Sequence, residues 1–153
     1  MKIRTMIISD IAAILEIQQE CRLSGWSAHS YEQEIALNDS VLLVAQVDGE
    51  TAGFLAARLI LPEAEILNFG ILDRYRKQGI GSGLFDKLLT IARTKRAESM
   101  WLEVRASNRN ALRFYENKGF TEIQKRKNFY ISPVEDAVIM KLDMSERSKK
   151  SPR

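Results

Sequence analysis

ILNFGILDRYRKQGIGSGL, residues 66–84, is the stretch that decides the fold. Its apolar start, residues 66–72, predicts a strand, and the apolar spacing over Gly79–Arg96 predicts a helix. Between them stands a glycine-rich loop, residues 76–83. Glycine lets the backbone approach a ligand closely, and a helix N-terminus offers unpaired N–H groups with a partial positive charge. Strand, loop and helix together predict a site for a phosphate or pyrophosphate.

A glycine-rich turn before a helix can also be purely structural, and the glycines alone leave that alternative open. Two other phosphate motifs do not fit. No Gly-Lys-Ser/Thr follows at P-loop spacing. A dinucleotide fold opens with a strand–helix–strand unit, whereas here antiparallel strands come first, with Asp48-Gly49 as a hairpin turn.

The rest of the chain predicts a mixture of helices and strands. A helix capped by Ser9 or Asp10 follows a first strand. We expect strands at residues 1–8, 41–47, 54–61, 66–72, 100–104, 120–123 and 137–142, a loop at 23–30, and further helices at 31–37 and 108–118. This order predicts an α+β fold in one domain, residues 1–144, with a mixed, mostly antiparallel central sheet flanked by helices. One strand–helix–strand crossover is expected between Ile66 and Val104.

The charge of the chain is concentrated in its last residues. The 153-residue chain has a net charge of +3, and residues 145–153 alone hold four basic residues against one acid, which is also +3. We therefore expect a basic, disordered tail over 145–153 on a neutral domain, rather than the basic face of a nucleic-acid-binding protein. No apolar run suits a membrane span, and no secretory signal begins the chain, so we expect a cytoplasmic protein.

One cysteine and one histidine limit the possible chemistry. Cys21 has no second cysteine for a disulfide, and nothing ties it to His29, so a Cys/His nucleophile is not favoured. With no cysteine pair and no histidine pair, we expect no metal site.

The glycine loop resembles a known family. Arg76-x-x-Gly79-x-Gly81 matches the Arg/Gln-x-x-Gly-x-Gly/Ala signature of the GNAT acetyltransferases, in which the loop amides hold the pyrophosphate of acetyl-coenzyme A. The run Leu102–Asn108 is similar to the RimI branch, which acetylates the N-terminal alanine of a ribosomal protein. Further similarity to this branch lies at Trp26-Ser27, Phe114-Tyr115, Gly119-Phe120, residues 126–130 and residues 135–137, and the resemblance runs from about Met1 to Leu142.

The resemblance implies a GNAT-like fold and a set of residues that bind acetyl-coenzyme A. In the family, the strand before the loop holds the acetyl carbonyl and the pantetheine arm through its backbone. Gly70 in this strand suits a bulge or a close approach of the ligand, and Asn108 also suits a helix cap. The implied cofactor-binding residues are Phe69, Gly70, Ile71, Arg76, Lys77, Gln78, Gly79, Ile80, Gly81, Ser82 and Asn108.

Two residues are implied as catalytic. Glu103 stands in an apolar strand, where partial burial would raise its pKa and make it a better base. The alternative is an ion pair with Arg105, and the sequence alone favours that alternative. Tyr115 has an O–H that stays protonated at neutral pH; its alternative is a core aromatic. The resemblance implies Glu103 as general base and Tyr115 as general acid.

The sequence identifies the acceptor substrate less closely than it identifies the cofactor site. The RimI resemblance implies the N-terminus of a small-subunit ribosomal protein as partner. From the charge distribution and the lack of a long apolar run, we expect no specific nucleic acid and no membrane as partners. Trp26 and Tyr130 suit either a peptide groove or core packing, and Phe129 stands where the branch often has tyrosine. Two alternatives remain open: a GNAT that acetylates a small amine or a lysine, and a non-catalytic module that binds acetyl-coenzyme A. The presence of both Glu103 and Tyr115 speaks against the module.

Overall fold

The computed structural model describes residues 1–23 and 25–145 and contains one seven-stranded sheet in the order β1-β2-β3-β4-β5-β7-β6. The strands are β1 (Lys2–Thr5), β2 (Ser40–Val47), β3 (Glu50–Ile60), β4 (Glu63–Ile71), β5 (Ser99–Arg105), β6 (Thr121–Ile131) and β7 (Val134–Asp143). The helices are α1 (Ile11–Glu20), α2 (Ala28–Ile35), α3 (Ile80–Thr94) and α4 (Arg109–Asn117), with short 3-10 turns η1 (Ile8–Asp10) and η2 (Asp73–Tyr75). Only β4 and β5 pair in parallel, joined through α3. The predicted α+β fold and its single crossover are therefore confirmed.

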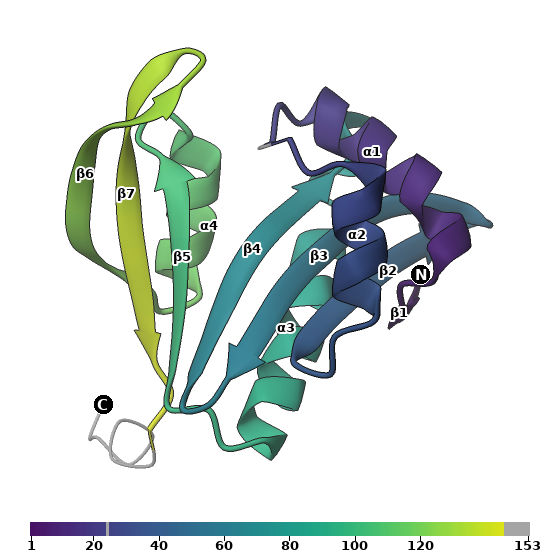
Figure 1. The fold of residues 1–153 in the computed structure, drawn as a ribbon, viewed down its shortest axis with the longest axis horizontal. Helices are drawn as coiled ribbons and strands as arrows, with labels where there is room; N and C mark the ends of the chain where they lie inside the picture. The colour runs from purple at the N-terminus through teal and green to yellow at the C-terminus, as the bar shows by residue number, and fades with distance from the viewer. Residues whose placement is uncertain (24, 146–153) are drawn as a thin grey trace.

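The helices cover both faces of the sheet. Helices α1 and α2 lie in front of β2–β4, and α3 and α4 lie behind the sheet (Figure 1). Leu84 and Leu88 of α3 belong to the core cluster on the rear face, and Ile14 of α1 belongs to the cluster on the front face. The helical spacing seen in the sequence therefore marks the buried sides of these helices.

Strands β4 and β5 separate halfway along their length. Their pairing runs only from Glu63 with Ser99 to Glu65 with Trp101, after which the two strands diverge (Figure 1). On its other side β4 contains a bulge, because Ala57 pairs with Ile66 and Ala56 with Asn68, which leaves Leu67 without a partner. A bulge bends its strand and increases the local twist, and this one lies where the strands separate.

The bulge corrects one expectation. Gly70 suits either a bulge or a close approach of the ligand on sequence grounds, and the bulge alternative is wrong, because Gly70 pairs regularly with Phe54. A Cβ at Gly70 would lie 2.9 Å from Leu23 Cδ1 and 3.2 Å from both Cys21 Sγ and Ile17 Cγ2. The glycine is therefore needed because the end of α1 packs closely on β4, and not because of a bulge.

Two predicted boundaries are also wrong. Helix α2 starts at Ala28, inside the expected loop, because the Ser27 hydroxyl caps it by accepting a hydrogen bond from the Ser30 N–H. The hairpin β6–β7 is much longer than predicted. Almost every residue of β6 is exposed, so no alternation of apolar and polar residues reveals the strand in the sequence.

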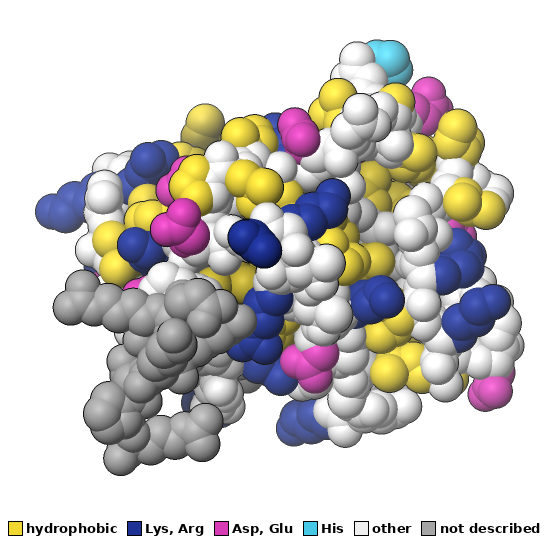
Figure 2. Space-filling model, turned by 90° about the horizontal axis from the view of Figure 1, so that it is seen from below, with side chains coloured by type: hydrophobic (Ala, Val, Ile, Leu, Met, Phe, Trp, Pro, Cys, Tyr) yellow, Lys and Arg dark blue, Asp and Glu magenta, His cyan; other side chains and the backbone are white. Residues whose placement is uncertain are grey.

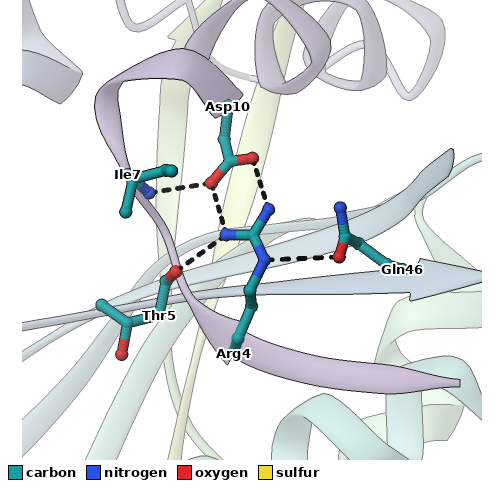
Figure 3. Close-up of polar contacts among 5 residues, drawn as sticks. All are labelled: Arg4, Thr5, Ile7, Asp10 and Gln46. Carbon is teal, nitrogen blue, oxygen red and sulfur yellow. Dashed lines mark hydrogen bonds and ion pairs between the residues drawn. The ribbon is translucent and has the colours of Figure 1, made fainter. Parts of the chain in front are cut away.

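The start of the chain is held by an ion pair rather than by a helix cap (Figure 3). Asp10 occupies the N-cap position of α1, one of the two positions that the sequence predicted, but its side chain makes no capping hydrogen bond to this helix. Its carboxylate instead accepts two hydrogen bonds from Arg4, each 2.8 Å, and one from the Ile7 N–H, also 2.8 Å. Arg4 also donates to the Thr5 carbonyl and to Gln46 on β2. These contacts lower the pKa of Asp10, chiefly through the hydrogen bonds from Arg4.

The surface carries mixed charge. On the face shown in Figure 2, Lys and Arg side chains are interspersed with hydrophobic and acidic ones. Of the predicted tail over 145–153, only Ser145 belongs to the described residues. Across residues 1–23 and 25–145, no helix has the length and apolar character needed to cross a membrane.

Candidate active site

A cavity of about 410 Å³ lies where β4 meets the start of α3. Most of the predicted cofactor-binding residues line this cavity: Phe69, Gly70, Ile71, Arg76, Lys77, Gly79, Ile80, Gly81 and Ser82. Phe114 and Tyr115 of α4 line its other side. Residues that are up to 46 positions apart in the sequence, from Phe69 to Tyr115, therefore surround one space. We call it the loop cavity.

The glycines shape the loop cavity. Gly79 has a φ of +83° at the N-cap of α3, a left-handed conformation that suits glycine. The first amides of α3, those of residues 80–82, have no partner within the helix and form its partially positive end. A Cβ on Gly81 would lie 3.7 Å from Phe114 and 3.8 Å from Phe69. A larger side chain there would occupy the cavity, so the cavity has both the space and the N–H donors that suit a pyrophosphate.

Two predicted cofactor residues lie outside the loop cavity. Gln78 is absent from its lining, and its side-chain amide donates to the Arg74 carbonyl at 3.1 Å. Asn108 caps α4, because its side-chain oxygen accepts from the Ala111 N–H at 3.1 Å, as the sequence predicted. Asn108 lines a second cavity instead.

The second cavity, about 120 Å³, lies between the separated ends of β4 and β5. Glu103 of β5 and Tyr115 of α4 both line it, as do Cys21, Asn68 and Tyr130. It shares Phe69, Ala111 and Tyr115 with the loop cavity. The two residues implied as catalytic are therefore brought to one space, which adjoins the predicted cofactor site.

Tyr115 is buried, with 7% of its surface exposed. Its ring packs against Phe120 and Phe114, with 5.4 Å between centroids in each case, so the core alternative is correct for the ring. Its hydroxyl makes no hydrogen bond to any described residue. Burial raises the pKa of Tyr115 above its ordinary value, so the phenol is protonated at neutral pH and able to donate.

Glu103 keeps 33% of its side chain exposed. The alternative ion pair with Arg105 is not formed. Arg105 instead pairs with Glu135 at 3.4 Å and lies 4.2 Å above the Tyr130 ring. Glu103 pairs with Arg126 of β6, with 3.6 Å between carboxylate oxygen and guanidinium nitrogen. The carboxylate is therefore held by a single, partly exposed cation beside the second cavity.

Trp26, in the loop before α2, and Tyr130, near the end of β6, have different surroundings. Trp26 lies 5.0 Å from the Tyr31 ring, centroid to centroid, and lines neither cavity. It is half-buried, packs against the front core cluster and borders a separate surface pocket at α2. Tyr130 lines the second cavity. Phe129 is 41% exposed and contacts Tyr130 edge-on, with 5.2 Å between ring centroids.

Sequence reasoning missed a buried polar network beside the second cavity. Tyr31 donates to Gln18 at 2.6 Å, and the Asn68 amide donates to Gln18 and to the Tyr31 oxygen at 3.1 Å each. Burial raises the pKa of Tyr31 to about 12. Asn68, a polar residue in an otherwise apolar strand, was the available signal. The network joins α1 and α2 to β4 next to the bulge at Leu67.

Comparison with known proteins assigns the chain to a family. The acetyltransferase (GNAT) family matches residues 11–120. The chain belongs to this family. A ribosomal protein bS18-alanine N-acetyltransferase from Escherichia coli K12 is 31% identical over 145 residues, 94% of this chain and 97% of the relative. One from Haemophilus influenzae is 35% identical over 137 residues, 86% of this chain and 90% of the relative.

A solved structure agrees with these relatives. The crystal structure of the ribosomal-protein-S18-alanine N-acetyltransferase from Escherichia coli superimposes with a TM-score of 0.86 at 28% identity and covers 99% of both chains. The GNAT-like fold is thereby confirmed. The chain is an acyltransferase of the GNAT family that resembles the RimI enzymes. Within the described part of the chain, no three His, Cys, Asp or Glu side chains are grouped to hold a metal ion.

Proposed function

We propose that this GNAT enzyme transfers an acetyl group from acetyl-coenzyme A to the N-terminal alanine of a small-subunit ribosomal protein. One observation carries the proposal: Glu103 and Tyr115 line one cavity that adjoins the cavity of the glycine loop. The names of the relatives, at 31% and 35% identity over most of the chain, support the alanine acceptor.

The loop cavity is the proposed binding site of acetyl-coenzyme A, which supplies the acetyl group as a thioester. The amides of residues 80–82 are suited to hold the pyrophosphate at the positive end of α3. Gly81 leaves the space it needs. The backbone of Phe69–Ile71 borders the same cavity and is suited to hold the pantetheine arm and the acetyl carbonyl.

The acceptor must lose a proton before it reacts. An α-amino group has a pKa of about 8 and is mostly protonated at neutral pH. Glu103 is proposed to accept this proton, directly or through one water. The amine lone pair then attacks the carbonyl carbon of the thioester, so that a C–N bond forms as the C–S bond breaks. The acetylated nitrogen then loses its second proton to solvent, which leaves the neutral amide.

The leaving thiolate needs a proton. Tyr115 faces both cavities and is protonated at neutral pH, so it is proposed to donate its O–H proton to the departing sulfur. A proton passed from Glu103 through solvent restores the phenol. The proposal thus uses one carboxylate for the first deprotonation of the amine and one phenol for the protonation of the sulfur, with no covalent enzyme intermediate.

A turnover assay with a panel of amines tests this function. The panel contains a peptide that begins with alanine, the same peptide with a blocked terminus and an internal lysine, and a polyamine. We expect the highest kcat/KM for the free alanine terminus, because a lysine amine, with a pKa of about 10.4, is harder to deprotonate. A higher kcat/KM for the lysine peptide or the polyamine would reassign the acceptor. If no amine is acetylated, the result would favour a non-catalytic module that binds acetyl-coenzyme A.

A further inference from the structure

A third cavity, about 470 Å³, forms a groove on the open face of the sheet beside the active site. Trp101 and Ile139 belong to the apolar part of its lining, and Glu63, Glu65 and Glu103 supply carboxylates. Glu103 lines both this groove and the second cavity. The groove therefore begins at the residue that is proposed to deprotonate the acceptor amine. We call it the acceptor groove.

The charges of the acceptor groove are unbalanced. Its two cations are already engaged, Arg58 with the buried Glu34 and Arg126 with Glu103. Neither Glu63 nor Glu65 forms an ion pair or hydrogen bond with another described residue. Burial raises the pKa of Glu65, the nearby charge of Glu103 raises it further, and the charge of Arg58 offsets only part of this rise. A cation supplied from outside would relieve both effects.

The spacing of these carboxylates suits an extended peptide. Glu65 pairs directly with Trp101, the last pair before β4 and β5 diverge, and Glu103 lies two residues further along β5 on the same face. The two acids are therefore separated by at least the diagonal spacing of a paired ladder, about 7–8 Å. Glu63 lies about 7 Å further along β4. An extended chain rises by about 3.3 Å per residue. A peptide with its amine at Glu103 therefore brings its second and third residues to Glu65.

We propose that the acceptor groove receives the residues that follow the acetylated alanine, and that Glu65 binds a Lys or Arg side chain at the second or third position. This inference rests on the proposed N-terminal acetylation. It follows from the continuity of the groove with the active site and from the unpaired carboxylates. The rings and methyl groups of Trp101 and Ile139 would contact the aliphatic stem of the basic side chain. Glu65 thereby becomes a residue that determines specificity.

Peptides of matched length test the proposal. They begin with alanine and carry two Arg, two Gln or two Glu residues at the second and third positions. With the unaltered enzyme we expect the KM of the Arg peptide to be about tenfold lower than that of the Gln peptide. The Glu peptide should have the highest KM of the three, and the kcat values should be similar. Glu65→Gln should reduce the Arg-to-Gln difference to less than about threefold.

Glu122→Gln is the matched control. Glu122 is exposed on β6 and pairs with the buried Met140, so it lies on the opposite face of the sheet. This variant should keep the full difference between the Arg and Gln peptides. Melting temperatures of both variants show that the fold is retained, and the peptide series on the unaltered enzyme needs no variant at all.

The outcomes separate this inference from the proposed function. Equal KM values for Arg and Gln peptides that are both acetylated at the terminus would overturn the inference and leave the proposed function standing. An unchanged Arg preference in Glu65→Gln would also overturn it. Failure to acetylate any alanine peptide would contradict the proposed function, and this inference with it.

Discussion

Glu103 and Arg126 form an ion pair that reaches across strand β7, with 3.6 Å between the carboxylate oxygen and the guanidinium nitrogen. Half of the Arg126 side chain is exposed. An acceptor ammonium that enters the second cavity is positively charged, as the Arg126 guanidinium is, and can replace Arg126 at the carboxylate. The carboxylate of the proposed base is therefore accessible, and it already binds a cationic side chain.

Replacing Glu103 with glutamine should lower kcat by roughly 10²-fold or more, because the amide keeps the shape of the side chain but cannot accept the proton. Acetyl-coenzyme A affinity should be unchanged, since Glu103 does not line the loop cavity. Steady-state kinetics and calorimetric titration measure the two quantities. Glu122→Gln, on the opposite face of the sheet, is the comparison variant and should keep kcat. Near-native kcat in Glu103→Gln at neutral pH would remove the general base from this account.

Tyr115→Phe should lower kcat by roughly 10²-fold or more through loss of the proton donor. Its melting temperature should stay close to that of the unaltered enzyme, because the ring packing is kept and the hydroxyl makes no hydrogen bond to a described residue. Thermal unfolding measured beside kcat separates the two effects. A variant that is folded and fully active would assign Tyr115 to the core alone.

Gly81→Leu should weaken acetyl-coenzyme A binding by at least about tenfold, because the side chain would fill the space beside the first amides of α3. Gly81→Ala is the matched control. Its Cβ would meet Phe114 and Phe69 at ordinary contact distances of 3.7 and 3.8 Å, so it should bind better than the leucine variant. Calorimetric titration gives both affinities. Equal, native-like affinities in folded variants would place the pyrophosphate elsewhere.

Asp10→Asn should destabilise the fold by about 2 kcal/mol at neutral pH through loss of the charged hydrogen bonds with Arg4. The pKa of Asp10 is lowered below its ordinary 3.8 in the folded state. Its stabilising effect is therefore complete above the unfolded pKa and is lost as the pH falls through the folded pKa. The stability difference between the two proteins should shrink below about pH 4. Urea unfolding at several pH values measures it, and a difference independent of pH would exclude the ion pair as its cause.

The sequence predicted those parts of the molecule whose signals are local. The loop at residues 76–82 and the capping of α4 by Asn108 each depend on a few adjacent residues, and the structure brings most of the loop residues to one cavity. Asp10 stands at the predicted N-cap position of α1, but its carboxylate makes no capping hydrogen bond there, because Arg4 on β1 competes for it. A rule based on adjacent residues cannot predict whether this carboxylate binds the amides of its own helix or a guanidinium from another strand.

Features that depend on strand register could not be predicted from the sequence. The bulge at Leu67 is defined by the pairing of β4 with β3, and nothing in the residues of β4 alone distinguishes it from a bulge at Gly70. The proximity of Glu103 and Tyr115 depends on how α4 packs against the separated strands, so the residues alone left both roles open. The acceptor groove combines residues of β3 to β7 and has no linear signature.

Mass spectrometry of one acetylated peptide tests the central claim most directly. The peptide begins with a free alanine, continues as in a small-subunit ribosomal protein, and contains an internal lysine, so that both amines compete in the same reaction with acetyl-coenzyme A. Fragmentation then locates the added acetyl group. The account predicts it on the alanine nitrogen, with loss of this product in Glu103→Gln. An acetyl group found mainly on the lysine would contradict it.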